Sequence, residues 1–144
     1  MKLFLDNNLP PSLAKALDAL IAPSHRAVHL RDKFPSHTPD LEWIAVLKRE
    51  SDWAILSQDQ FRESSAERKA LAESGLVVYW LSGKQWNKLP SLEKNLAVLE
   101  WTREILEHAE HSVREAQRTG KGSAWSIKYV PNNRKRSFTK EELS

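Results

Sequence analysis

Three aspartates in this chain stand where a folded α/β protein usually carries its chemistry. Asp6 follows a run of three apolar residues near the N-terminus, Asp40 lies in the first turn of a predicted helix, and Asp59 follows a second apolar run. If both runs are strands of one parallel sheet, their carboxyl ends lie at the same edge, and ligands of open α/β sheets bind beyond that edge. The spacing therefore predicts that the three carboxylates converge there.

Gathered carboxylates repel one another and need a compensating partner. At about 4 Å and an effective dielectric constant near 20, one such pair costs roughly 4 kcal/mol. A shared proton or a bound cation offsets this repulsion. Ligands that are all oxygens favour Mg²⁺ or Mn²⁺, and such ions activate water and stabilise the oxygens of an in-line phosphoryl displacement. The pattern therefore indicates a divalent metal site in which Asp6, Asp40 and Asp59 are both metal ligands and catalytic residues.

Each aspartate also has a purely structural explanation. Asp6 is a residue type that forms turns, and Asp40 is favourable at the positive end of a helix dipole. Asp59 is a good N-cap for the helix predicted after it. Taken singly these explanations are the stronger ones, so only the shared location of the three residues favours the metal site.

The segments that must position these aspartates alternate between strands and helices. Short apolar or alternating runs predict the strands, and apolar residues at helical spacing predict the helices. This order predicts an α/β fold with one mostly parallel sheet flanked by helices. We expect a single domain over residues 1–130 and a flexible basic tail over residues 131–144. Strands are expected over 2–5, 27–30, 53–56, 76–81 and 124–130, and helices over 11–21, 38–50, 62–73 and 91–119.

Three short motifs resemble those of PIN-like domains. Residues 5–10 (LDNNLP) resemble the opening of these domains, in which an Asp ends the first strand. Residues 38–43 (TPDLEW) resemble their second acidic motif, and residues 55–59 (ILSQD) resemble their third. The order and spacing agree with a compact PIN-like, Rossmann-like group found among the VapC-type toxins of toxin–antitoxin systems. The resemblance covers roughly residues 1–82.

The resemblance implies a Mg²⁺- or Mn²⁺-dependent endoribonuclease that an antitoxin protein holds inactive. It assigns metal binding to Asp6, Asp40 and Asp59, with Glu42 as a weaker fourth ligand because a helix directs residues two apart to different sides. Many relatives carry an acid where this chain has Asn7. Because an amide binds cations less well than a carboxylate, the resemblance leaves open whether Asn7 helps to bind a second metal ion.

Positive charge is concentrated toward the C-terminus. Residues 1–112 carry 14 Lys and Arg against 16 Asp and Glu, whereas residues 113–144 carry 8 against 3. Such asymmetry indicates an anionic partner, although a solvated tail has the same composition. We expect the basic cluster to contact the RNA backbone. Its members are Lys128, Arg134, Lys135 and Arg136.

Two rival functions fit parts of the same pattern. A receiver domain that forms an aspartyl phosphate also places acids after its first and third strands, but it needs a tight acidic pair where this chain has Asp6-Asn7. A catalytically silent PIN-like module would bind RNA or protein without cleavage, and Asn7 is its main support.

The composition excludes some classes of protein. There is no Cys, so disulfides and thiolate metal sites are excluded. The chain shows no signal-peptide pattern and no apolar stretch of membrane-spanning length, so a cytoplasmic protein with no membrane contact is expected. The long helix over 91–119 is a candidate surface for homo-oligomer formation. We expect His108 on this helix to be an ordinary surface histidine.

Overall fold

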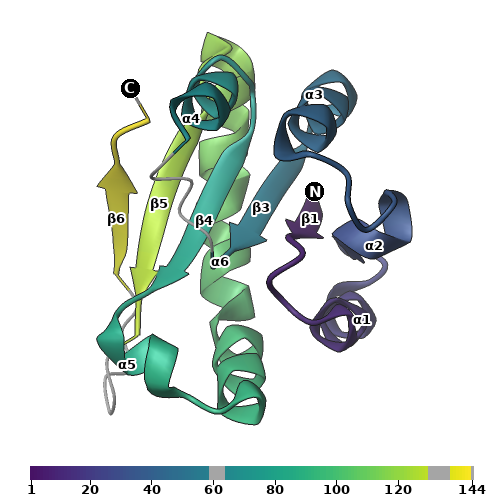
Figure 1. Ribbon diagram of the computed structural model, residues 1–144, viewed down its shortest axis with the longest axis vertical. Coiled ribbons are helices and arrows are strands. Elements are labelled where there is room, and N and C mark those ends of the chain that lie inside the picture. Colours follow the sequence, from purple (N-terminus) through teal and green to yellow (C-terminus); the bar gives the residue numbers. More distant parts are fainter. Residues whose placement is uncertain (59–63, 130–136, 144) are drawn as a thin grey trace.

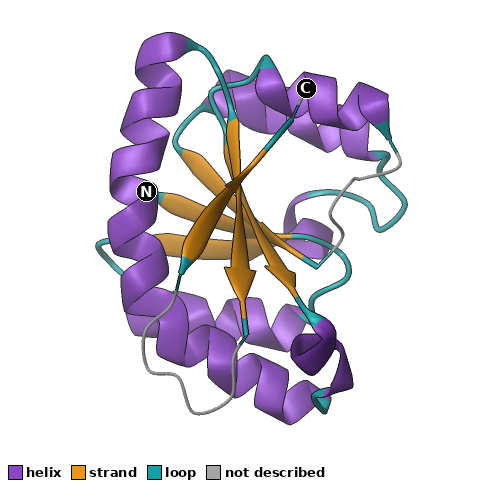
Figure 2. Cartoon of the chain, turned by 90° about the vertical axis from the view of Figure 1, so that its left-hand side faces the viewer, coloured by secondary structure: helices purple, strands orange, loops and turns teal. Residues whose placement is uncertain are grey.

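A six-stranded sheet forms the middle layer of the protein, with helices on both of its faces (Figures 1 and 2). The computed structural model describes residues 1–58, 64–129 and 137–143. The strand order is β2-β1-β3-β4-β5-β6, and all neighbouring pairs are parallel except β5 with β6. This arrangement confirms the predicted α/β class. The strands are β1 (Lys2–Leu5), β2 (Arg26–His29), β3 (Trp53–Ser57), β4 (Val77–Ser82), β5 (Ser123–Lys128) and β6 (Phe138–Glu141). The helices are α1 (Pro11–Ile21), α2 (Leu30–Lys33), α3 (Asp40–Glu50), α4 (Ser65–Ala72), α5 (Lys84–Lys88) and α6 (Ser91–Thr119).

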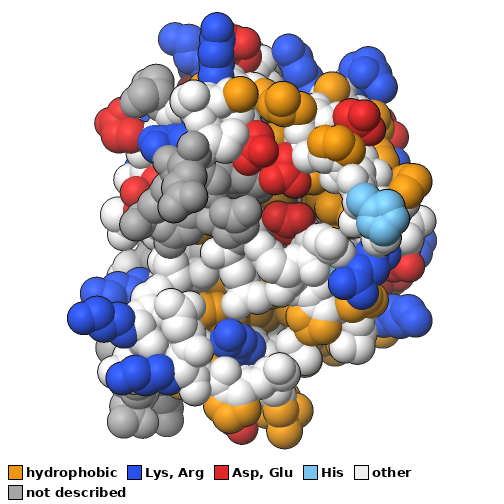
Figure 3. Space-filling model, viewed as in Figure 1, with side chains coloured by type: hydrophobic (Ala, Val, Ile, Leu, Met, Phe, Trp, Pro, Cys, Tyr) orange, Lys and Arg blue, Asp and Glu red, His pale blue; other side chains and the backbone are white. Residues whose placement is uncertain are grey.

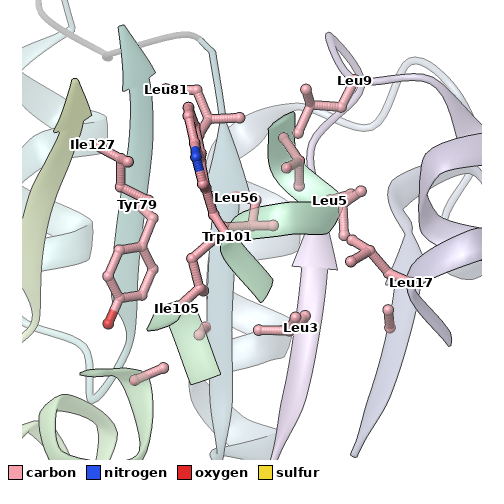
Figure 4. Packing of buried hydrophobic residues seen from close by; sticks show 14 of the residues in the cluster. Leu3, Leu5, Leu9, Leu17, Leu56, Tyr79, Leu81, Trp101, Ile105 and Ile127 are labelled. Atoms are coloured by element: carbon pink, nitrogen blue, oxygen red, sulfur yellow. The ribbon is translucent and has the colours of Figure 1, made fainter. Parts of the chain in front are cut away.

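The alternation of side chains along the strands divides the apolar core into two parts. In β1, Leu3 and Leu5 face α1 and α6, whereas Phe4 faces α3. Figure 4 shows the first part, in which Trp101 and Ile105 of α6 lie over side chains from several strands. Strands buried on both faces need the continuous apolar runs that the sequence shows. The packed sheet therefore fixes where the parallel strands end at its carboxyl edge.

The buried face of α6 differs from the predicted one. The apolar spacing over residues 91–119 predicts a buried stripe that includes Leu92 and Leu96, but these side chains are 65% and 44% exposed. Trp101 and Ile105 are buried instead, each with 1% exposure. The first turns of α6 project beyond the carboxyl edge of the sheet (Figure 1), so they have no strand to pack on. The helix ends as predicted at Gly120, which adopts the left-handed conformation with φ 70°.

Three elements were not predicted. Helix α2 occupies part of an expected polar loop, and its N-terminus is capped because the Arg31 N–H donates to His29 Nδ1. Helix α5 replaces part of an expected turn and buries Trp86 completely. Strand β6 replaces the predicted flexible tail at residues 138–141, because this segment pairs with β5 and fills space beside α6.

Phe138 anchors β6 to the rest of the molecule. Its ring stacks on His108, with 4.2 Å between centroids and 17° between planes. The Tyr79 hydroxyl donates to His108 Nδ1 at 2.7 Å, and Trp125 meets the same imidazole edge-on. The prediction that His108 is an ordinary surface residue was therefore wrong. The imidazole is half-buried in an aromatic cluster that holds the last strand in place.

The helices offer no membrane span. Within the described ranges, none is both long enough and apolar enough to cross a bilayer.

Candidate functional site

Asp6 is held rigidly at the carboxyl edge of β1. Its backbone N–H continues the ladder by donating to Leu56 O at 3.0 Å, and its side chain is only 5% exposed. The Asn7 backbone N–H donates to Oδ1 at 2.6 Å, and the Ser57 hydroxyl donates to Oδ2 at 3.0 Å. Both carboxylate oxygens therefore have fixed directions. Each carboxylate oxygen can also bind a cation while it accepts a hydrogen bond, because it carries two lone pairs.

The loops after β1 and β3 are fastened to each other beside Asp6. The Gln58 backbone N–H donates to Asn8 Oδ1 at 3.1 Å, and the Gln58 side-chain amide donates to Asn8 O at 2.7 Å. The Asn8 amide also donates to Ser57 Oγ at 3.4 Å. These contacts hold the two strand ends that carry the first and third acidic motifs in one register.

A buried histidine supports the loop after Asp6 and was not identified from the sequence. His29 is completely buried at the end of β2, and its Nδ1 accepts the Arg31 backbone N–H at 3.1 Å. The ring proton is therefore assigned to Nε2, which donates to Leu9 O at 2.6 Å. His29 ties β2 to the loop that begins at Asp6. Its only sequence signal is that a polar residue ends an otherwise apolar strand.

Asn7 accepts a hydrogen bond from a cationic side chain. Arg31 Nε donates to Asn7 Oδ1 at 2.8 Å, and the Asn7 amide donates to Ser36 O at 3.4 Å. An acid at this position would form an ion pair with the guanidinium instead. Asn7 therefore links the loop after Asp6 to the segment that leads into α3.

Asp40 lies at the first position of α3, on the segment that Asn7 contacts through Ser36. Its Oδ1 accepts the indole N–H of Trp43 at 2.9 Å, which fixes one oxygen of this half-buried carboxylate. Pro39 rather than Thr38 occupies the N-cap position, because the Thr38 hydroxyl donates to a carbonyl in the preceding turn. The helix begins at Asp40, two residues after its predicted start at residue 38, and Asp40 lies in its first turn, as expected.

The remaining predicted ligands are less well placed or lie outside the description. The Glu42 side chain is exposed in the first turn of α3. Asp59 lies outside the described residues, although β3 ends two residues before it. Among the residues that the structure does describe, no three His, Asp or Glu side chains are close enough to hold a metal ion. The predicted three-aspartate site therefore stays a prediction.

The chemistry of the donors at this edge suits a hard cation. Asp6 and Asp40 present carboxylate oxygens, and Asn7 and Asn8 add amide oxygens nearby. The chain has no Cys, so no thiolate competes for a softer metal. Mg²⁺ and Mn²⁺ prefer such oxygen donors. The donor types are thus those that these ions prefer, although the described residues do not gather into a metal-binding cluster.

Charge is distributed unevenly around this site. In the face shown in Figure 3, acidic side chains gather near the centre, and most Lys and Arg side chains lie around them. Lys128 is exposed at the end of β5, opposite Ser82 of β4, and so lies at the carboxyl edge that Asp6 occupies. The other three predicted RNA-binding residues, Arg134, Lys135 and Arg136, lie outside the described residues.

Comparison with known protein families identifies the first half of the chain. A family model described as a PIN-like domain matches residues 1–83, which is more than half of the sequence. The match contains β1 to β4 and both described candidate ligands, Asp6 and Asp40. Searches of curated proteins and of solved structures gave no significant match.

Proposed function

The chain belongs to the PIN-like domain family, and on that premise we propose that it is a metal-dependent endoribonuclease. PIN-like domains have a nuclease-type fold, and in this fold the reaction takes place at the carboxyl edge of the sheet. The observation that carries the proposal is Asp6, a nearly buried carboxylate at that edge with both oxygens oriented by hydrogen bonds. A nearly buried carboxylate with fixed oxygens, at the edge where α/β sheets bind ligands, is preorganised to hold a cation.

Asp6, Asp40 and Asp59 would hold the Mg²⁺ or Mn²⁺ ion. When bound, the ion supplies an activated water and neutralises charge on the phosphodiester. The protein contributes orientation, because Ser57 fixes Asp6 and the Trp43 indole fixes Asp40. Such neighbours of metal ligands usually change metal affinity or activity by about 10–100-fold.

Basic side chains at the same edge would position the RNA backbone. Lys128 stands at the carboxyl end of β5, and Phe138, the first residue of β6, pairs with Ile127. The described residues on both sides of the basic segment therefore lie near the edge that holds Asp6. We include Arg134, Lys135 and Arg136 in the proposed RNA-binding surface on this ground.

The resemblance to VapC-type toxins extends the proposal to a cellular role. In that role the protein is the toxin of a toxin–antitoxin pair, and a partner protein blocks the carboxyl edge until it is removed. Expression of the chain alone should arrest growth, and expression of Asp6→Asn should not. Equal growth with both proteins would contradict the toxin role without bearing on RNA cleavage in vitro.

The direct test is cleavage of a labelled structured RNA by the purified protein with Mg²⁺, Mn²⁺ or EDTA. We expect cleavage that requires the metal and is lost in Asp6→Asn, but is retained in Glu107→Gln. Glu107 is an exposed carboxylate on α6, so its neutralisation controls for the loss of one charge. If the RNA binds in a salt-sensitive way but is never cut, the silent binding module becomes the better account.

The hydrogen bond that Arg31 donates to Asn7 favours this silent binding module. It places a guanidinium cation against Asn7, the position at which many relatives carry an acid.

A further inference from the structure

A cavity of about 580 Å³ opens at the carboxyl edge, between the loop after β1 and the first turns of α6. Its charged lining residues among those described are Arg31 and Lys94, and no described Asp or Glu lines it. The apolar residues Pro10 and Pro11 also line it and are half-buried, and the buried side chains of Leu9, Leu13 and Val98 pack behind its surface. The cavity therefore combines an apolar wall with two cations, and its size falls within the usual range for small-ligand pockets of about 300–1,000 Å³.

Polar groups of the cavity can recognise more than charge. Asn95 and Gln58 line it and offer amide donors and acceptors. The N-termini of α1 and α6 also open into it, at Ser12 and Ser91, and neither helix has a side-chain cap. The positive ends of these helix dipoles add to the charges of the two basic residues. An anionic ligand with a flat, hydrogen-bonding body fits this combination.

The wall of the cavity is connected to Asp6 by successive contacts. Asn8, two residues after Asp6, accepts the backbone N–H of Gln58. Gln58 Oε1 accepts the indole N–H of Trp86 at 2.8 Å, and Lys94 Nζ lies 5.7 Å from the centre of the Trp86 ring. A ligand in the cavity thus lies next to the loop that orients the candidate metal ligand.

We propose that this cavity is a nucleotide pocket that holds one unpaired nucleotide of the RNA beside the phosphodiester presented to Asp6. The phosphate lies between Arg31 and Lys94, and the base lies against the half-buried rings of Pro10 and Pro11. Only a base that has left its stack can enter such a pocket, so the pocket selects unpaired positions. This inference rests on the proposed nuclease function, because that function supplies the RNA.

The test measures binding in EDTA, where no metal-dependent cleavage occurs. The probes are a labelled single-stranded RNA oligonucleotide, with adenosine or uridine 5′-monophosphate and inorganic phosphate as competitors. Lys94→Glu should weaken oligonucleotide binding by about tenfold, and the slope of log Kd against log salt should fall by roughly one. Asn95→Trp, which fills the cavity, should abolish competition by the mononucleotides.

Arg103→Glu is the matched control. Arg103 is exposed on α6 and lies nine residues beyond Lys94, so helical geometry places it on the opposite side of the helix. Arg103→Glu should change the Kd for the oligonucleotide by no more than about twofold. Both variants reduce the general attraction of RNA to a basic surface equally, so a larger effect of Lys94→Glu reports on the cavity. Thermal unfolding of each variant confirms that the protein is folded.

The possible outcomes separate this inference from the proposed function. Equal weakening by Lys94→Glu and Arg103→Glu, or competition by inorganic phosphate as strong as that by mononucleotides, would overturn the pocket. Metal-dependent cleavage with an unchanged KM in Lys94→Glu and Asn95→Trp would also overturn it while the nuclease stands. Binding that depends on Lys94, without cleavage in Mg²⁺ or Mn²⁺, would support the pocket and contradict the nuclease.

Discussion

Ser57→Ala tests whether the site depends on the orientation of Asp6. Ser57 is completely buried in β3, and its hydroxyl donates to Asp6 Oδ2 at 3.0 Å. A hydrogen bond to a charged group contributes about 2 kcal/mol, so the melting temperature should fall by roughly 6 °C. Loss of a residue that orients a metal ligand should lower Mn²⁺ affinity and cleavage by about 10–100-fold. Titration calorimetry with Mn²⁺ and cleavage rates over a range of Mn²⁺ concentrations measure both effects.

Ser126→Ala supplies a control with the same chemistry at another place in the sheet. Ser126 is buried in β5, and its hydroxyl donates to the carboxylate of Glu141 in β6. This substitution should cost a similar amount of stability but leave Mn²⁺ affinity and cleavage unchanged. If both substitutions lower cleavage equally after correction for the folded fraction, or if Ser57→Ala does not alter Mn²⁺ binding, the reasoning about Asp6 is refuted.

Three further predictions concern β6 and its surroundings. Burial lowers the pKa of His108 from its ordinary value of 6.5, with a smaller contribution from His111. The unfolded chain then binds a proton at His108 more tightly than the folded chain, so the free energy of unfolding should fall as pH drops below about 6.5. Urea unfolding at several pH values should show a smaller fall in His108→Gln than in the wild-type protein. Phe138→Ala should cost about 2 kcal/mol and accelerate hydrogen exchange in β6 before other strands, whereas unchanged exchange would contradict the anchoring role. Gly122→Ala should cost at least about 2 kcal/mol of stability, because its Cβ would lie 1.9 Å from the backbone carbonyl oxygen of Leu71. Gly120→Ala should cost only about 1 kcal/mol, because the added Cβ meets open space and only the φ of +70° is unfavourable. Equal melting temperatures of the two variants would contradict this.

The parallel part of the fold could be predicted because each strand is a short apolar run followed by turn residues. The run before Asp6 shows this directly, since three consecutive apolar residues followed by turn formers suit a strand covered on both faces. Strand β6 escaped prediction because its sequence is largely polar and exposed, and its main anchor, the ring of Phe138 on His108, is a contact between distant parts of the chain. Periodicity within a segment carries no information about such contacts.

The candidate site was predictable only in part, for a related reason. Asp6 and Asp40 stand at the end of a strand and the start of a helix, and local pattern locates both positions. Two of the groups that hold Asp6 and its loop do not follow from local pattern, because Ser57 and His29 belong to other strands and bond to Asp6 and Leu9 across the sheet. Sequence can therefore indicate which residues react, whereas the residues that hold them in place become visible only in three dimensions.

The covering of the sheet by α6 has a consequence for how the chain can be divided. The family match ends at residue 83, but Trp101 and Ile105, which lie beyond it, cover strands within it. A fragment that stops at residue 83 would lose the α6 side chains that cover β3 and β4 on this face, and with them a large part of the burial that offsets chain entropy. The end of the family match is therefore not the end of a folding unit. Residues 1–83 and α6 should unfold together in one cooperative transition.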